Sequence, residues 1–263
     1  MSRGEDLRRI VEALGAACSI LAAFTPGEIV QRSKSGGDPV TEADLAIDAA
    51  LRRILPRTNE GWLSEETIDD PERLDRERVW VVDPLDGTKE FVSGIPEWCV
   101  SIGLVENSRP VAGGICIPAR GLQVVGAVGS GVEVNGEPPR PRAASGLDGA
   151  EVLASRSEVD RGEWRRFAGA PFVVRPMGSV AAKLALVAAG LTDATWTLVP
   201  KHEWDVAGGA ALVLAAGGDV WRLDGSSPRF NQPKPKFDGL FAAAAGLRDP
   251  IERYFREIGI RAN

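Results

Sequence analysis

Residues Trp80–Phe91 read WVVDPLDGTKEF, and this stretch decides how the rest of the chain is interpreted. The apolar run Val79–Val82 overlaps its start and ends at Asp83 and Pro84. A short β-branched and aromatic run bounded by Pro and Gly predicts a buried strand that runs into a tight turn. Asp83 and Asp86, two carboxylates three residues apart, are therefore expected at the mouth of that strand.

The residues after the two aspartates predict an anion-binding turn. Gly87 lets the backbone approach a ligand closely, and Thr88 adds a hydroxyl group. The next residues can start a helix, whose free N–H groups favour an anion. Carboxylates beside an anion site are both explained if divalent cations and a phosphate bind there. Asp-Pro and Asp-Gly are also common turn dipeptides, so a simple turn remains the alternative for this motif alone.

Length and composition indicate an ordinary globular protein. The 263 residues allow one large domain or two closely packed lobes, and 44% hydrophobic with 26% charged residues is typical of soluble proteins. A net charge of -6 argues against a nucleic acid polymer or an anionic membrane as a partner. No apolar run reaches the length of a membrane span, and the N-terminus is patterned as a helix rather than as a signal peptide.

The cysteines and the histidine exclude several kinds of site. Cys18, Cys99 and Cys116 are odd in number and form no CxxC pair, so neither a disulfide framework nor a zinc site is expected. This cysteine usage favours the reducing cytoplasm as the location. The single histidine, His202, rules out a histidine-rich metal site. Because the chain is acidic, a bound phosphate would need local positive charge, which metal ions would supply.

The first half of the chain is predicted to place helices beside an antiparallel sheet. Amphipathic spacing predicts a helix over residues 5–24, and Thr41 with Asp44 forms a capping box for a helix over residues 42–55. Residues Asp69–Arg78 are interpreted as a solvated surface loop. The sheet is expected to continue from the motif strand, with a hairpin at Asn135-Gly136 and strands at Cys99–Val105, Val111–Ile117 and Leu122–Val128.

The second half alternates strands with helices, which predicts an α/β layer. The segment Pro138–Gly149, rich in Pro, Gly and Ser, is the predicted boundary between an N-terminal lobe, residues 1–140, and a C-terminal lobe, residues 141–263. Strands are predicted at Glu151–Ser155, Phe172–Val174, Ala194–Leu198, Asp219–Leu223 and Leu240–Ala245. Helices are predicted at Asp160–Phe167, Gly178–Ala189, Val206–Ala216 and Pro250–Ile258.

Two further acidic segments have more than one interpretation when each is considered alone. Glu65 and Glu66 follow an apolar pair, and they could either solvate a strand end or bind a metal ion. Asp205 comes just before an Ala-rich helix, where it could be a simple N-cap or a metal ligand. His202 could line a substrate pocket or serve packing.

The whole pattern Trp80-x-x-Asp83-Pro84-x-Asp86-Gly87-Thr88-x-x-Phe91 resembles the signature of the inositol monophosphatase superfamily, the magnesium-dependent, lithium-sensitive phosphomonoesterases. Three other segments carry the same resemblance. Asp38–Asp44 resembles a D-x-V-T-x-x-D motif that follows a lysine-containing loop, here Gln31–Gly37. Gly61–Thr67 resembles a G-E-E-S motif with Ser64 in place of its glycine, and Trp204–Gly209 with the following Ala215–Gly218 matches the C-terminal signature.

This resemblance implies the fold class α/β, as a layered αβαβα sandwich in which distant carboxylates converge. It implies two Mg²⁺ ions, a third and weaker ion that shares Glu65, and inhibition by Li⁺. One Mg²⁺ would take Glu65, Asp83 and the Leu85 carbonyl. The second would take Asp83, Asp86 and Asp205. Oxygen ligands of this kind suit Mg²⁺, which prefers carboxylates, water and phosphate.

The resemblance also implies how a small-molecule phosphate ester would be hydrolysed. Asp44, acting through Thr88, would orient or accept the proton of a metal-activated water, which attacks in line without a phosphoenzyme. The backbone N–H groups of Gly87 and Thr88 would hold the phosphate, while Gly178, Ser179 and Asp205 would contact the substrate. Dimerisation is common in this family, so a homodimer is expected.

Details of the motifs favour one branch of the superfamily. Lys89-Glu90-Phe91 and Ala154–Ser157 resemble the 3'(2'),5'-bisphosphate nucleotidases, which degrade 3'-phosphoadenosine 5'-phosphate to AMP and phosphate. Inositol enzymes place a glutamate seven residues before the C-terminal metal aspartate, where this chain has Leu198. Inositol-1-monophosphatase or another sugar phosphatase remains an alternative. A catalytically weak regulatory protein that binds phosphate ligands is the alternative from another class, although every expected metal ligand is present.

Overall fold

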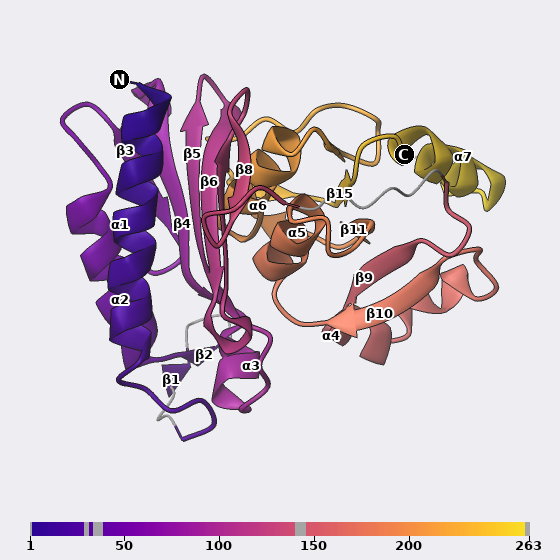
Figure 1. The fold of residues 1–263 in the computed structure, drawn as a ribbon, viewed down its shortest axis with the longest axis horizontal. Coiled ribbons are helices and arrows are strands. Elements are labelled where there is room, and N and C mark those ends of the chain that lie inside the picture. Colours follow the sequence, from indigo (N-terminus) through magenta and orange to yellow (C-terminus); the bar gives the residue numbers. More distant parts are fainter. Residues whose placement is uncertain (1, 29–31, 34–38, 140–145, 261–263) are drawn as a thin grey trace.

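The computed structural model describes residues 2–28, 32–33, 39–139 and 146–260. Its helices and sheets alternate in layers (Figure 1). One face of a six-stranded sheet is covered by α1 (Arg3–Leu21) and α2 (Glu42–Ile54), and the other by α5 (Val180–Ala188) and α6 (Glu203–Ala215). A five-stranded sheet lies beyond α5 and α6, with α7 (Arg248–Glu257) on its far side. This αβαβα order confirms the predicted fold class.

The motif strand lies near one edge of the six-stranded sheet. The strand order is β3-β4-β5-β6-β7-β8, with β3 parallel to β4 and every later pair antiparallel. Val79 and Val81 pack in the core beside α5 and α6, and Trp80 and Val82 pack beside α1 and α2, so β4 is buried on both faces. The bounds are β3 (Gly61–Ser64), β4 (Arg78–Asp86), β5 (Cys99–Glu106), β6 (Arg109–Ile117), β7 (Leu122–Ala127) and β8 (Gly131–Val134).

β4 extends beyond the predicted end of the strand. The sequence predicts a turn that starts at Asp83, but β4 continues to Asp86, with an irregular register against β5 between these two aspartates. Pairing with β5, which places Ser101 opposite Asp83, keeps the aspartates on extended backbone. The turn begins at Gly87, whose φ of 96° leads into α3 (Thr88–Val92).

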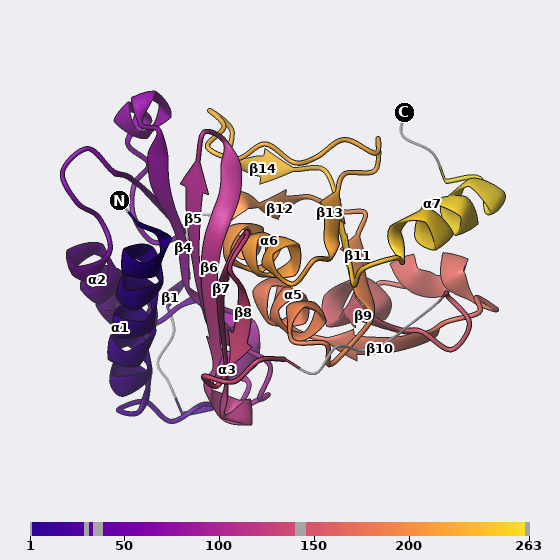
Figure 2. The same ribbon diagram turned by 45° about the horizontal axis from the view of Figure 1, so that its top comes forward.

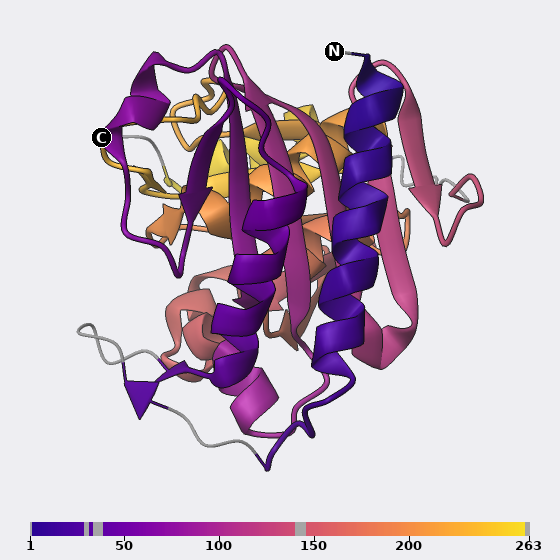
Figure 3. The same cartoon turned by 90° about the vertical axis from the view of Figure 1, so that its left-hand side faces the viewer.

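The helices and strands predicted for the first half are confirmed. α1 and α2 lie side by side on the sheet (Figure 3). Thr41 and Asp44 form the predicted capping box at the start of α2, because the Thr41 side chain and backbone each exchange a hydrogen bond with the first turn. Asn135 and Gly136 form the turn after β8, both with positive φ. The three cysteines are free thiols, as expected.

The predicted surface loop Asp69–Arg78 is wrong in part. It contains a 3-10 helix, Pro71–Asp75, and the first residue of β4. Arg73 is buried, and its guanidinium pairs with Asp69 at 2.6 Å and donates to the Asn231 side chain at 2.6 Å. Arg73 is therefore buried although it lies in a charged run, because a distant segment supplies hydrogen-bond partners that the local sequence pattern does not reveal.

The second half forms a mixed sheet with the order β10-β9-β11-β15-β13. Its strands β10, β9 and β11 are parallel, and β15 is antiparallel to both of its neighbours. The single helix predicted at Asp160–Phe167 is wrong, because Gly162 with φ of 81° separates α4 (Arg156–Asp160) from a 3-10 helix, Glu163–Phe167. The strands are β9 (Glu151–Ser155), β10 (Val173–Met177), β11 (Ala194–Thr197), β13 (Asp219–Trp221) and β15 (Leu240–Ala243).

Two pairs of short strands and one further turn of 3-10 helix complete the elements. The pairs are β1 (Arg32–Ser33) with β2 (Pro39–Val40), and β12 (Lys201–His202) with β14 (Lys236–Phe237). The 3-10 turn, Pro118–Arg120, joins β6 to β7. The strand pair β12–β14 lies beside the start of α6 (Figure 2).

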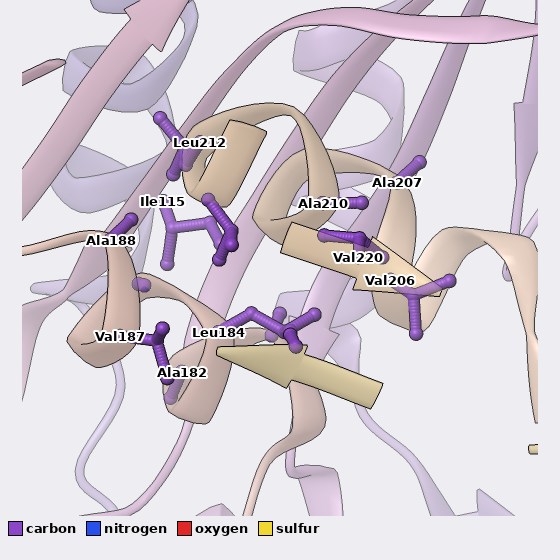
Figure 4. Close-up of a cluster of buried hydrophobic side chains, with 14 of the residues drawn as sticks. Ile115, Ala182, Leu184, Val187, Ala188, Val206, Ala207, Ala210, Leu212 and Val220 are labelled. Carbon is purple, nitrogen blue, oxygen red and sulfur yellow. The ribbon is translucent and has the colours of Figure 1, made fainter. Parts of the chain in front are cut away.

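A hydrophobic core between the sheets positions α6. Side chains from α5, α6, β6 and β13 interdigitate there, including Leu184, Ile115 and Val220 (Figure 4). Gly208 of α6 lies directly against Gly113 of β6, where an added Cβ on Gly113 would come within 2.3 Å of the Gly208 carbonyl oxygen. This close approach allows the first turn of α6 to lie near the end of β4.

The predicted lobe boundary lies at Pro138–Gly149, of which residues 140–145 are outside the described part of the chain. Every strand of the six-stranded sheet precedes this segment, and every strand of the five-stranded sheet follows it. The division into two lobes stays a prediction. Within the described ranges, no helix has both the length and the apolar character needed to cross a membrane.

Candidate active site

Three carboxylates from separate parts of the sequence meet at the end of β4. One oxygen each from Glu65, Asp83 and Asp205 lies within 4.8 Å of the others. Glu65 directly follows β3, which is the parallel neighbour of β4, and Asp83 lies within β4 itself. Asp205 comes from the first turn of α6. The structure therefore brings together three residues that the sequence predicts as metal ligands.

Asp205 is not the N-cap residue of α6, which was one of the two interpretations of the sequence. α6 begins at Glu203, so the cap position belongs to His202 and Asp205 is in the first helical turn. The Asp205 carboxylate accepts the His202 backbone N–H at 2.9 Å. His202 also stacks on Trp204, with ring centroids 4.4 Å apart. The stacking supports a packing role for His202.

The cluster is electrostatically unfavourable without a cation. Burial raises the pKa of Asp83 well above its ordinary value, and the neighbouring charges of Glu65, Asp86 and Asp205 raise it further. Burial, together with the charges of Asp86 and Glu65, raises the pKa of Asp205 to about 8. A hard divalent cation would relieve this repulsion, and carboxylate oxygens in this arrangement are ligands that Mg²⁺ prefers. The residues present therefore fit a magnesium site.

Asp44 and Thr88 form a pair behind the carboxylate cluster. The Thr88 hydroxyl lies 3.1 Å from an Asp44 carboxylate oxygen and 2.9 Å from the Leu85 carbonyl oxygen. The other Asp44 oxygen accepts the Thr41 backbone N–H at 2.8 Å, so the capping box also orients this carboxylate. The Leu85 backbone N–H donates to Asp83 at 3.0 Å, which ties the same turn to the cluster. Capping and a site role for Asp44 are thus compatible.

Asp86, in the first half of the chain, is hydrogen-bonded to residues of the second half. Its carboxylate accepts the Ser179 hydroxyl at 2.7 Å and the Ala181 backbone N–H at 2.6 Å, both at the start of α5. Asp86 is not among the three residues whose oxygens lie within 4.8 Å in the described part of the chain, although its charge raises the pKa values of Asp83 and Asp205. The Gly178 N–H donates to Glu97 at 2.6 Å, so its hydrogen is directed at a protein carboxylate.

A cavity of about 300 Å³ opens beside the carboxylates. The predicted site residues that line it are Glu65, Asp83, Leu85, Asp86, Gly87, Thr88, Gly178, Ser179 and Asp205. Asp44 is not part of the lining and is joined to it through the Thr88 hydroxyl. Asp38 and most of the Gln31–Gly37 loop lie outside the described residues.

Cationic side chains line the same cavity, and sequence reasoning missed most of them. The cavity lining contains Lys89, Arg156, Arg161, Lys183 and Lys201. Arg156 pairs with Glu97 at 2.6 Å, Arg161 with Glu163 at 2.6 Å, and Lys201 with Glu158 at 3.2 Å. Arg161 and Lys201 lie in segments without a recognised motif, so only the fold brings them to the site.

Lys183 is the most deeply buried of these cations. It is 3% exposed, and its ammonium donates to the carbonyl oxygens of Ser179 at 2.7 Å and Met177 at 3.3 Å. Burial lowers the pKa of Lys183 to about 8. These carbonyls belong to the turn in which Ser179 has a φ of 56° and contacts Asp86. The sequence feature that could have indicated Lys183 is that it is the single charged residue within the apolar helix VAAKLALVA.

Known proteins resemble this chain along most of its length. The model of the inositol monophosphatase family matches residues 6–255. An inositol-1-monophosphatase, ImpA, from Mycolicibacterium smegmatis is 33% identical over 97% of this chain and 95% of its own. A 3'-phosphoadenosine 5'-phosphate phosphatase from Mycobacterium leprae is 33% identical over 81% of this chain and 80% of its own. The structure of an inositol monophosphatase from Anabaena superposes with a TM-score of 0.78, at 27% identity over 95% of both chains.

Proposed function

Because the chain belongs to the inositol monophosphatase family of phosphomonoesterases, we propose that it is a Mg²⁺-dependent 3'(2'),5'-bisphosphate nucleotidase. The proposed reaction converts 3'-phosphoadenosine 5'-phosphate to AMP and phosphate. The observation that carries the proposal is the lining of the 300 Å³ cavity, which combines a carboxylate cluster with cationic side chains. A substrate with two phosphate groups uses both features, whereas a monophosphate uses one.

The carboxylates would hold the metal ions. We assign Glu65, Asp83 and the Leu85 carbonyl to one Mg²⁺, and Asp83, Asp86 and Asp205 to a second. Bound Mg²⁺ would lower the pKa of a water molecule and neutralise charge on the phosphoryl group. The convergence of Glu65, Asp83 and Asp205 within 4.8 Å supports this assignment.

Protein groups around the metal site would orient the reactants. Asp44, hydrogen-bonded to the Thr88 hydroxyl at 3.1 Å, would take up the proton that this hydroxyl receives from the attacking water. The backbone N–H groups of Gly87 and Thr88, which line the cavity, would hold the phosphate. The phosphate ester would then be positioned for direct attack, without a phosphoenzyme.

The cationic side chains would bind the second phosphate of a nucleoside bisphosphate. Arg161, Lys201 and Arg156 enter the cavity from segments after β9 and before α6, while the carboxylates come mainly from the ends of β3 and β4. Leu198, at the position of the glutamate in inositol enzymes, packs against an aromatic cluster and does not line the cavity. Because this position offers the cavity no carboxylate, it favours a nucleotide over an inositol phosphate as the substrate.

Inositol-1-monophosphatase activity is the second candidate. It is favoured by ImpA, which is similar to this chain over 97% of its length. The test is phosphate release with Mg²⁺ from 3'-phosphoadenosine 5'-phosphate, inositol 1-phosphate, fructose 1,6-bisphosphate and histidinol phosphate. We expect kcat/KM for the nucleotide to exceed the others by at least about tenfold, which corresponds to about 1.4 kcal/mol. A higher value for inositol 1-phosphate would replace the nucleotidase assignment, and no release from any substrate would favour a binding protein.

Arg161→Met tests the proposed second-phosphate contact. A charge-assisted hydrogen bond contributes about 1.5–3 kcal/mol, so we expect KM for 3'-phosphoadenosine 5'-phosphate to rise about tenfold or more, with kcat changed less than about threefold. Turnover of inositol 1-phosphate should be unaffected. Arg175→Met is the matched control, because Arg175 of β10 pairs with Glu151 of β9 and does not line the cavity. Equal effects of both variants on KM would contradict the assignment.

Lys183→Met tests whether the buried ammonium keeps the Ser179 turn in place. Loss of the ammonium removes its hydrogen bonds to the Ser179 and Met177 carbonyls and frees the turn that orients Asp86. A small displacement of a reacting group can cost about a hundredfold, so we expect kcat to fall about 10- to 100-fold and the Mg²⁺ concentration for half-maximal activity to rise. Leu186→Met, in the same helix, is the control and should keep both values. An unchanged Mg²⁺ requirement would show that Lys183 does not act through Asp86.

A further inference from the structure

Two cysteines that are distant in the sequence have their sulfur atoms in contact. Cys18 lies in α1 and Cys116 in β6, 98 residues apart, and their Sγ atoms are separated by 2.8 Å. Both are free thiols. A disulfide requires the sulfur atoms to approach to about 2.05 Å, so little further movement would be needed to bond them.

The packing of α1 on the sheet explains why these sulfurs meet. Ile10, Leu14 and Cys18 are spaced by four residues and therefore share one face of the helix. Gly114 and Cys116 share one face of β6 because side chains alternate along a strand. A Cβ on Gly114 would come within 2.2 Å of the Ile10 side chain, so the missing side chain allows α1 to lie close to β6. This close packing brings the Cys18 sulfur next to the Cys116 sulfur.

We propose that Cys18 and Cys116 form an oxidisable thiol pair, which hydroperoxides convert to an intramolecular disulfide between α1 and β6. The Cys18 sulfur attacks a peroxide oxygen, forming an S–O bond while the O–O bond breaks and hydroxide leaves. The Cys116 sulfur then attacks the Cys18 sulfur, and the S–O bond breaks with loss of water. In total, two thiols are oxidised to one disulfide, and hydrogen peroxide is reduced to two water molecules.

The surroundings assign the order of the two steps. Cys18 is half-buried and reachable by a small oxidant, while Cys116 is 7% exposed. The hydrogen bond between the thiols lowers the pKa of Cys18, although burial opposes this, and it raises the pKa of Cys116. Cys18 is therefore the thiol that reacts with the oxidant, and Cys116 is the thiol that closes the disulfide.

Cys99 provides an internal control. It is buried, its sulfur lies 3.3 Å from the Ser179 hydroxyl, and burial raises the pKa of its thiol well above its ordinary value. Its sulfur therefore contacts a hydroxyl group, whereas Cys18 and Cys116 contact each other. Cys99 should remain reduced under oxidation that converts the pair.

The experiment is peptide mapping of the folded full-length protein before and after treatment with hydrogen peroxide. The protein is quenched, unfolded, alkylated without reductant, and cleaved after glutamate. This cleavage separates the cysteines, because Cys18 falls in residues 13–28, Cys99 in 98–106 and Cys116 in 107–133. We expect 13–28 to become cross-linked to 107–133, reversibly with dithiothreitol, while 98–106 is alkylated. The melting temperature should rise by about 5–10 °C, because a disulfide that closes a loop of about 100 residues constrains the unfolded chain.

Variants make the proposal falsifiable. Cys18→Ser should abolish both the cross-link and the rise in melting temperature, while phosphatase activity is retained because α1 does not line the cavity. Cys116→Val, which keeps the buried site apolar, should do the same if Cys116→Ser fails to fold. Separate alkylation of Cys18 and Cys116 after full exposure to peroxide would overturn the proposal. Over-oxidation of Cys18 alone, or a cross-link that includes Cys99, would also overturn it.

Discussion

Asp83→Asn is expected to lower Mg²⁺-dependent kcat about a thousandfold or more while the protein remains folded. Asp83 is 1% exposed at the centre of the carboxylate cluster, and both proposed Mg²⁺ ions share it. An amide keeps the shape but removes the negative charge, and a metal ion contributes several kcal/mol of charge stabilisation in the transition state. A thousandfold loss corresponds to about 4 kcal/mol. The measurement is initial-rate phosphate release at saturating Mg²⁺.

The same variant should be at least as stable as the wild type when metal is absent. Removing one charge from Glu65, Asp83 and Asp205 relieves repulsion, so the melting temperature in EDTA should not fall. Asp75→Asn is the matched control, since Asp75 is exposed in a 3-10 helix away from the cavity. Retained activity of Asp83→Asn with intact metal binding, measured by calorimetry, would sink the metal-site assignment.

Metal-free protein is expected to lose stability between about pH 4 and pH 8, and Mg²⁺ should restore it. The pKa of Asp205 is raised from 3.8 to about 8 in the folded protein. A carboxyl group with a higher pKa in the folded state binds its proton more tightly there, so its contribution to stability is complete below its unfolded pKa. That contribution is lost as the pH rises through about 8. Because Asp205 is partly exposed, solvent screening limits the effect to about 2–4 kcal/mol.

The measurement is thermal unfolding from pH 5 to pH 8.5, in EDTA and in excess Mg²⁺. Mg²⁺ at a hundred times its Kd adds about 2.7 kcal/mol, and the added stability should be larger at pH 8 than at pH 5. The titration of Glu60 does not contribute to the change of stability with pH between pH 5 and pH 8.5. Although burial opposes the shift, hydrogen bonds from Arg9, Trp80 and Arg78 lower its pKa to about 2. Asp205→Asn should flatten the EDTA curve, and a wild-type curve that rises with pH would contradict the prediction.

The sequence alone determined the features that depend on neighbouring residues. Runs of β-forming residues predicted β5, β6 and β7, and the capping box at Thr41 and Asp44 predicted the start of α2. Such signals are local, because strand propensity and capping depend on side chains and backbone groups only a few residues apart. The spaced motif around Asp83 and Asp86 was likewise sufficient to indicate the family.

The tertiary structure decided what depends on packing between distant segments. Pairing with β5 carries β4 to Asp86, and the contact of α6 with the sheet brings Asp205 to Asp83 from the first turn of a helix rather than from its cap. The cations Arg161, Lys183 and Lys201 reach one cavity only because the end of α4, the first half of α5 and the start of β12 lie beside it. The contact between Cys18 and Cys116 similarly requires α1 to lie across β6. No local pattern encodes these distances, because they follow from the summed packing of two sheets around α5 and α6.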